Sequence, residues 1–112
     1  PEVRLRTWTA RAYTGLEQPI TFAMPGCRLD EDAPEWIAAQ RAVKEALGRP
    51  VEVGLWTFAT DGGHLNAAGV PCVGFGPGEE AMAHVVDERV SIEQMVEATA
   101  AYMALALALG AR

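Results

Sequence analysis

The sequence is short of basic residues. Nine Lys and Arg stand against fifteen Asp and Glu, so the formal net charge is −6. Contact with nucleic-acid phosphates needs an excess of Lys and Arg, and so does attraction to an anionic membrane surface. We therefore expect neither a nucleic acid nor a membrane as a partner.

Long apolar runs and secretion signals are also missing. The longest apolar run covers residues 98–111, which is shorter than the roughly 20 residues that a membrane-spanning helix needs. No basic segment followed by an apolar stretch indicates a signal peptide. The chain starts at Pro1 without a Met, which we expect of a processed or truncated product. These features favour a cytoplasmic location.

Several familiar site motifs are absent. The sequence has neither G-x-x-x-x-G-K nor G-x-G-x-x-G, which disfavours a nucleotide-binding protein, and it has no H-E-x-x-H zinc motif. Cysteine is scarce too: Cys27 and Cys72 form one possible pair and do not have the spacing of a zinc knuckle. We expect two reduced, partly buried thiols.

What is present is a regular alternation of apolar segments and turn signals. Half of the 112 residues are hydrophobic, as in an ordinary small soluble domain. The clearest helix signals are Asp32 as a cap, Pro34 in the first turn and Gly48 after the end. The expected elements are, in order, a strand at 2–14, a short strand at 20–24, a helix between Asp32 and Gly48, a buried strand at 51–60, a short helix at 64–68, a strand at 70–75 and a long helix after Ser91.

The final helix has a recognisable start and one apolar face. Ser91 and Gln94 have the spacing of a capping box. Apolar and small residues then recur at helical spacing. The residues expected to share this face are Ile92, Met95, Val96, Thr99, Tyr102, Met103 and Ala106.

The order of helices and strands predicts an α/β fold with a parallel-rich sheet. In such sheets, ligands bind beyond the carboxyl ends of the strands. Two segments fall at these ends, Asp61 with the glycines that follow it, and the loop 76–84. We expect these segments to lie side by side.

His84 is the strongest candidate for chemistry. Neutral imidazole is the commonest metal ligand, and Asp87 and Glu88 are near enough in sequence to order its loop. Glycines in the preceding segment, Gly76-Pro77-Gly78, allow a ligand to approach the backbone and its unpaired N–H groups. A surface histidine after an ordinary strand-to-helix turn remains the alternative.

Other polar residues have open interpretations. Asp61 ends a strand, so it either shapes a site or caps the helix that follows. His64 is expected to be structural or exposed. Glu79 and Glu80 are read as a solvated pair, or as a source of negative potential near a cation.

The stretch from Thr57 to Gly78, continued by Ala83-His84 and by Asp87-Glu88-Arg89-Val90, resembles the end of a zinc-hydrolase family. That family contains aminoacylases, acetylornithine deacetylase, succinyl-diaminopimelate desuccinylase and carboxypeptidase G. Its members show an Ala-Gly-Val-Pro-like turn, a Phe-Gly-Pro-Gly loop and an Ala-His segment with acidic residues after it. The similarity covers about residues 34–110.

The resemblance implies a zinc-dependent exopeptidase-like (phosphorylase/hydrolase-like) catalytic domain, of which residues 34–112 would be the C-terminal half. Residues 1–14 would be the last strand of an inserted lid or dimerisation domain, and 15–33 a hinge. His84 would ligate one of two zinc or cobalt ions, whose bridging hydroxide attacks an amide carbonyl. Gly76, Pro77 and Gly78 would contact the substrate, and Asp61 would shape the pocket wall. The complete enzyme would be a homodimer.

Two positions depart from the family pattern. Gly63 stands where many members have an Arg that pairs with a substrate carboxylate. Val85-Val86 replaces the Thr-Pro that usually follows the ligand histidine.

Most of the family's site is not matched in this sequence. A dinuclear site needs about five or six ligand positions, and one residue here matches. We expect the chain alone to be inactive, with no catalytic base of its own, and to require the remainder of the catalytic domain. The alternative is a non-catalytic α/β binding or assembly module derived from that fold.

Overall fold

The N-terminal part of the chain is a hairpin. The computed structural model describes residues 2–110, in which β1 (Thr7–Arg11) pairs antiparallel with β2 (Glu17–Thr21). In the turn, the Gly15 N–H donates to the Ala12 carbonyl at 2.9 Å, and Gly15 has a φ of 84° that glycine adopts without strain. The first strand is shorter than predicted and the second begins earlier, because pairing sets the strand ends.

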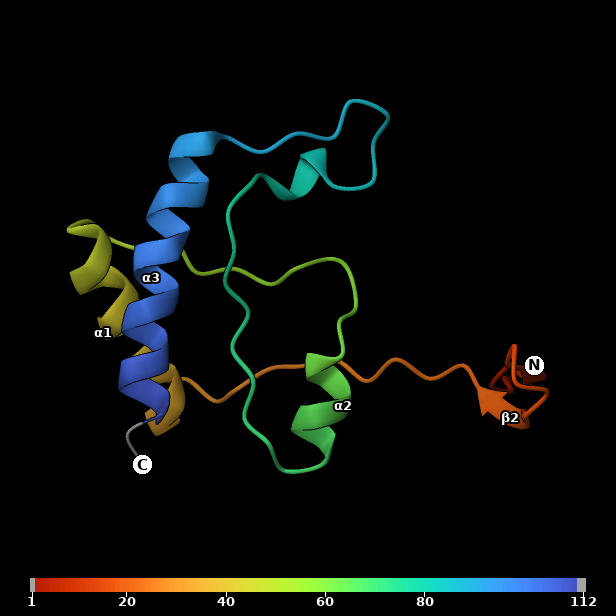
Figure 1. Ribbon diagram of the computed structural model, residues 1–112. Coiled ribbons are helices and arrows are strands. Elements are labelled where there is room, and N and C mark those ends of the chain that lie inside the picture. Colours follow the sequence, from red (N-terminus) through yellow and green to blue (C-terminus); the bar gives the residue numbers. More distant parts are fainter. Residues whose placement is uncertain (1, 111–112) are drawn as a thin grey trace.

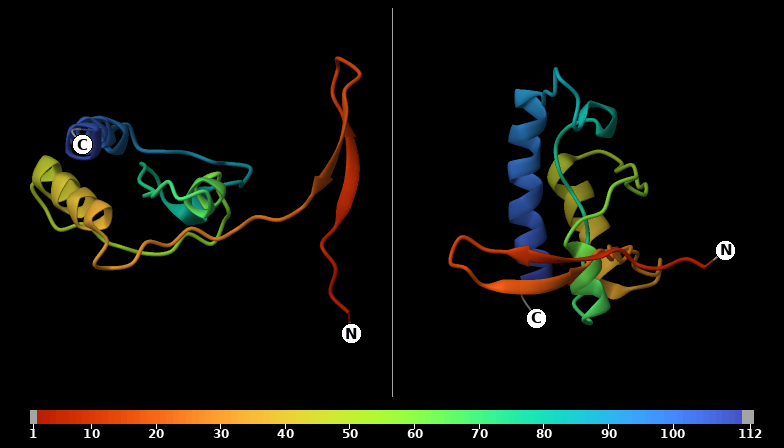
Figure 2. Two further views of the ribbon diagram at one scale, coloured as in Figure 1. Left: turned by 90° about the horizontal axis from the view of Figure 1, so that it is seen from below. Right: turned by 90° about the vertical axis from the view of Figure 1, so that its right-hand side faces the viewer.

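This hairpin stands apart from the rest of the molecule. An extended connector joins it to the helices, and Figures 1 and 2 show the hairpin at the far side of this connector. Every strand residue except Ala10 is exposed. Nothing in residues 2–110 covers either of its faces, so its stability rests on the ladder and on one aromatic contact, between Trp8 and Phe22, with ring centroids 6.3 Å apart.

Helix α1 (Pro34–Leu47) begins one residue later than the predicted cap implied and ends before Gly48, as predicted. Pro34 lies in the first turn, where its missing N–H costs nothing. At the other end, Gly48 has a φ of 63° and its N–H donates to the Lys44 carbonyl at 3.0 Å. The predicted cap was wrong: Ala33 occupies the cap position and no side chain caps the helix, because Asp32 lies one residue too early.

Helix α3 (Ile92–Gly110) packs against α1 and forms the core (Figure 1). Small side chains dominate the contact, which lets the two backbones approach closely. Ser91 caps α3 as predicted, since its Oγ accepts the Gln94 N–H at 3.4 Å. The buried hydrophobic residues are Ala39, Ala42, Val43, Ala98 and Ala101.

The larger apolar residues of α3 lie on its other side. They share a face, as the spacing predicted, but this face is exposed, and Ile92, Val96 and Met103 are all more than half exposed. The helix is apolar nearly all round, so it has a small-residue face for α1 and a second apolar face that is largely uncovered in residues 2–110, apart from Tyr102, whose ring meets Phe75.

The predicted parallel-rich sheet is not present in residues 2–110. The two-stranded hairpin is the only sheet of this region. Segments 51–60 and 70–75 are extended but form no ladder, and 52–60 are exposed, so the prediction of a buried strand there was wrong. They meet instead through side chains, because the Trp56 ring lies over Gly74 so closely that a Cβ at position 74 would collide with it. A strand pattern becomes a strand only when a neighbour accepts its hydrogen bonds.

Helix α2 (Gly62–Ala67) is packed against the connector. A Cβ added to Gly62 would lie 3.5 Å from Cys72 Cβ and 3.9 Å from Cys27 Sγ. Cys27 Sγ donates to the Cys72 carbonyl at 3.4 Å. Both thiols are free and half-buried, as predicted, and they bring the connector next to segment 70–75.

The molecule is open. Its radius of gyration is 17.7 Å, whereas about 13 Å is usual for a compact domain of this length. Its accessible surface is 9163 Å², against about 6,000 Å² for a compact monomer of the same mass. Much apolar surface that folding normally buries is therefore uncovered.

By length and composition alone, α3 is also long and apolar enough to cross a membrane, with 19 residues and a mean hydropathy of 1.2. Such a helix is equally typical of a protein core. In the described residues only 11% of its apolar window is buried, at Ala98 and Ala101, and Glu97 on the same helix forms an ion pair with Arg49 at 2.6 Å.

Candidate functional site

His84 lies in an unusual backbone conformation. It follows the short 3-10 helix η1 (Glu80–Met82) and has a φ of 61°, the one positive φ of a non-glycine residue within 2–110. The left-handed region costs such a residue about 1 kcal/mol or more, and strain of this kind gathers at functional sites. The Glu88 carboxylate accepts the His84 backbone N–H at 3.3 Å. As predicted, an acidic residue that follows His84 orders its loop, and the imidazole itself is exposed.

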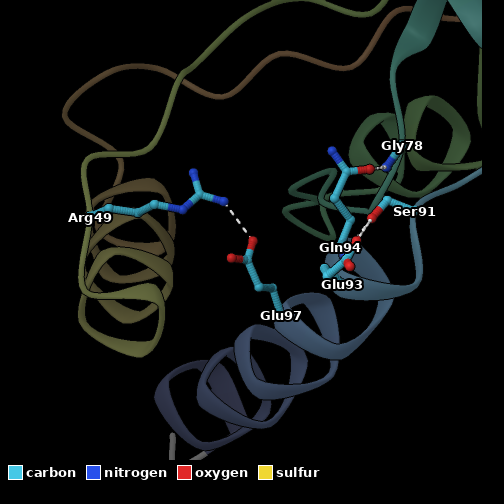
Figure 3. Close-up of polar contacts among 6 residues, drawn as sticks. All are labelled: Arg49, Gly78, Ser91, Glu93, Gln94 and Glu97. Carbon is cyan, nitrogen blue, oxygen red and sulfur yellow. Dashed lines mark hydrogen bonds and ion pairs between the residues drawn. The ribbon is translucent and has the colours of Figure 1, made fainter.

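Two side chains of α3 hold the loop 76–84 at its start. The Gln94 Oε1 accepts the Gly78 N–H at 3.1 Å (Figure 3), and the Tyr102 hydroxyl donates to the Phe75 carbonyl at 3.1 Å. The rings of Tyr102 and Phe75 also meet edge to face, with centroids 5.7 Å apart. One of the N–H groups expected to be unpaired is therefore already taken.

Further along, a side chain of the loop itself ties it to another segment. The Glu80 carboxylate accepts hydrogen bonds from the Thr57 N–H at 2.6 Å and the Thr57 hydroxyl at 2.5 Å. The hydroxyl, and then the backbone N–H, lower the pKa of Glu80 below its ordinary value of 4.5. Glu79 and Glu80 are both exposed, as expected of a solvated pair, but Glu80 also ties the loop to segment 51–60, which the sequence did not predict.

Asp61 is exposed and immediately precedes α2. Its backbone carbonyl accepts the Leu65 N–H at 3.1 Å, and its side chain makes no capping bond. Within 2–110 no hydrogen bond joins its carboxylate to the loop 76–84. Thr57, four residues before Asp61, bonds to Glu80 of the loop, so the contact is made by segment 51–60 and the expected juxtaposition of Asp61 with the loop stays a prediction. The proposed pocket role of Asp61 stays a prediction, and its alternative as a side-chain cap is not seen.

Gly63 cannot be replaced by a larger residue without a change in the backbone. It is buried in α2, and a Cβ there would collide with the Pro25 carbonyl oxygen of the connector. The Arg that many family members have at this position therefore has no room here. A substrate carboxylate would need another partner.

A metal centre is not assembled by the described part of the chain. Within residues 2–110, no three His, Cys, Asp or Glu side chains converge on one point. His64, the second histidine, is exposed on α2, in agreement with its predicted role. His84 is thus a single exposed imidazole on a loop whose backbone is held by hydrogen bonds.

Sequence reasoning missed four residues that shape the loop. Thr57, Glu80 and Tyr102 had been assigned no such role, and Gln94 had been read as one half of a capping box. Its side chain instead turns away to Gly78, while the Glu93 carboxylate accepts the Ser91 hydroxyl at 2.6 Å (Figure 3). No periodicity reports such contacts, since they join residues 16 to 27 positions apart.

Comparisons with known proteins agree with the family resemblance. Residues 16–108 match the model of Peptidase family M20/M25/M40. The chain is 31% identical over 106 residues to the Escherichia coli protein YgeY, covering 94% of this chain and 26% of that protein. No solved structure matches.

Two further relatives have a named activity. The N-formyl-4-amino-5-aminomethyl-2-methylpyrimidine deformylase of Bacillus subtilis is 62% identical over 40 residues, which are 36% of this chain and 9% of that enzyme. Its counterpart from Halalkalibacterium halodurans is 32% identical over 96 residues, 74% of this chain and 22% of the enzyme. The chain spans about a quarter of YgeY, which it matches over nearly its whole length. With the family model covering most of its residues, the chain belongs to Peptidase family M20/M25/M40, a family of hydrolases.

Proposed function

We propose that this chain supplies the C-terminal wall of the catalytic domain of a metal-dependent amide hydrolase. The loop 76–84 carries one metal ligand, His84, and presents the backbone of Gly76, Pro77 and Gly78 to the substrate, while Asp61 shapes the neighbouring wall. The strained left-handed conformation of His84, φ 61°, is the observation that supports this most. A surface histidine gains nothing from such strain, whereas a ligand held in one direction does.

The donor set fits a zinc or cobalt ion as far as this chain contributes to it. An exposed imidazole is a suitable ligand, and its backbone is fixed by the Glu88 carboxylate. A pair of such ions supplies a polarised carbonyl and a hydroxide nucleophile. This chain's part is to orient one ligand and one stretch of substrate-facing backbone, and both lie on a loop held by three side chains.

The substrate we propose is a small amide, of the N-acyl amino acid, dipeptide-like or N-formyl type. The deformylases named above act, by their names, on an N-formyl group. Because Gly63 leaves no room for a carboxylate-binding Arg, this chain adds nothing that selects a free carboxylate at that position.

The partner we propose is the remainder of the catalytic domain, in a cytoplasmic homodimeric enzyme. It would cover the exposed apolar face of α3 and segments 51–60 and 70–75, which have strand patterns but no ladder. The division into lid end, 1–14, hinge, 15–33, and catalytic half, 34–112, belongs to the same proposal.

The two histidines provide a matched test. The protein expressed from the gene that contains this chain is loaded with Zn²⁺ or Co²⁺ and assayed on N-formyl and N-acyl amides. We expect hydrolysis that a chelator abolishes, that His84→Ala lowers by at least a hundredfold with loss of bound metal, and that His64→Ala leaves unchanged.

Two outcomes oppose the proposal. Full activity and full metal content in His84→Ala would exclude the residue as a ligand. A wild-type protein that binds no metal and hydrolyses no amide favours instead the non-catalytic binding or assembly module.

A further inference from the structure

The loop 76–84 is attached to the final helix at two points that have different chemistry. At one point a backbone donor, Gly78 N–H, meets the Gln94 side-chain oxygen at 3.1 Å. At the other a backbone acceptor, the Phe75 carbonyl, receives the Tyr102 hydroxyl at 3.1 Å. Both bonds are made to main-chain atoms, so they fix the path of the loop whatever side chains it carries.

Gln94 and Tyr102 are eight residues apart on α3, about two turns, and therefore on the same side of the helix. They bracket the substrate-facing segment 76–78. Gly76 lies next to Tyr102, because a Cβ added to Gly76 would be 3.5 Å from the Tyr102 hydroxyl. A shift of α3 along its axis would move both attachment points together, and with them the loop.

We propose that Gln94 and Tyr102 are positioning residues for the reaction, which set how closely the backbone of Gly76–Gly78 approaches the substrate. The inference rests on the proposed function. It assigns to α3 a role beyond packing on α1: one face, through Ala98 and Ala101, fixes the helix, and these two side chains transmit its position to the site.

The substitutions remove the hydrogen bonds between α3 and the loop one at a time, and matched controls report any general effect on folding. Gln94→Leu removes the acceptor for Gly78, whereas Gln94→Glu keeps an oxygen there. Tyr102→Phe removes the donor but keeps the ring that meets Phe75. Gln18→Leu and Tyr13→Phe, in the exposed hairpin region, make the same chemical changes away from the loop.

The expected result has two parts. In the expressed protein, NMR should show exchange of the Gly78 amide with water roughly fivefold faster or more in Gln94→Leu, with recovery in Gln94→Glu. On an N-formyl or N-acyl amide, Gln94→Leu and Tyr102→Phe should raise KM and lower kcat/KM by roughly ten- to a hundredfold. Gln94→Glu and the hairpin variants should stay near wild type.

Each contrary outcome has its own meaning. Unchanged Gly78 exchange in Gln94→Leu overturns the attachment. Faster exchange with unchanged KM overturns the positioning role as proposed, whether or not kcat falls. If the wild-type protein hydrolyses no amide, the proposed function fails and this role fails with it, while the exchange rates still report whether the attachment exists.

Discussion

At the scale of single residues, the backbone of His84 distinguishes it from His64. His84 lies in the left-handed region with a φ of 61°, and His64 lies inside α2. In the left-handed region glycine is preferred to alanine by about 1 kcal/mol. Inside a helix alanine is preferred to glycine by about 1 kcal/mol. The same pair of substitutions should therefore have opposite effects at the two positions.

We expect His84→Gly to be more stable than His84→Ala, and His64→Ala to be more stable than His64→Gly. Urea unfolding of the four variants of the expressed protein measures these differences. Both His84 variants should lack the bound metal. The same order at both positions would mean that His84 does not hold this backbone conformation in solution.

The Glu80 carboxylate makes the loop sensitive to acid. Two hydrogen bonds from Thr57 stabilise its charged form and lower its pKa. A group with a lowered pKa in the folded state contributes stability above its unfolded value, here about 4.5, and loses this contribution as the pH falls through the folded pKa. The attachment of the loop to Thr57 should thus be complete at neutral pH and be lost only below about pH 4.5.

An NMR titration tests this. The amide signal of Thr57 should move with a midpoint below pH 4.5, and Glu80→Gln should abolish the movement. A midpoint at or above that value would show that the Thr57 bonds do not form.

At the scale of elements, the sequence predicted helix α1 and misplaced the sheet for different physical reasons. The ends of α1 depend on local chemistry, with Pro34 at one end and Gly48 at the other. The strands expected at 51–60 and 70–75 need neighbours to bond with, and residues 2–110 do not supply them. An acidic residue that orders the loop of His84 could be predicted from the sequence, whereas the contacts of Gln94 and Tyr102 depend on where α3 lies in space.

The sequence also could not predict which face of α3 is covered. The helix is apolar nearly all round, so its periodicity cannot say which face α1 covers. In the structure the covered face is the one with the smallest residues, and Ala101 is completely buried. Close contact of the two backbones there should tolerate no larger side chain.

We expect Ala101→Leu to destabilise the protein by about 1–3 kcal/mol, because the added volume forces α1 and α3 apart. Ala106→Leu, at an exposed position of the same helix, adds the same atoms without this cost. Thermal unfolding followed by circular dichroism compares the two. Equal stabilities would place α1 on another face of α3.

At the scale of the whole molecule, too little surface is buried for independent stability. The chain exposes 9163 Å², about 3,000 Å² more than a compact monomer of its mass. Somewhat more than half of such surface is apolar, so at about 25 cal/mol per Å² the excess leaves tens of kcal/mol of hydrophobic stabilisation unrealised, which exceeds the net stability of about 5–15 kcal/mol of ordinary domains. Only five residues form the buried hydrophobic core in the described part of the chain.

We therefore expect the 112-residue chain, expressed by itself, to unfold without a cooperative transition or to associate with itself. Calorimetry and sedimentation measure these two properties. Addition of a segment that carries the rest of an M20-type catalytic domain should restore a sharp transition, because it buries the second face of α3 and completes ladders on 51–60 and 70–75. A sharp, concentration-independent transition of the monomeric chain alone would contradict this, since it would require the exposed apolar surface to be stable in water.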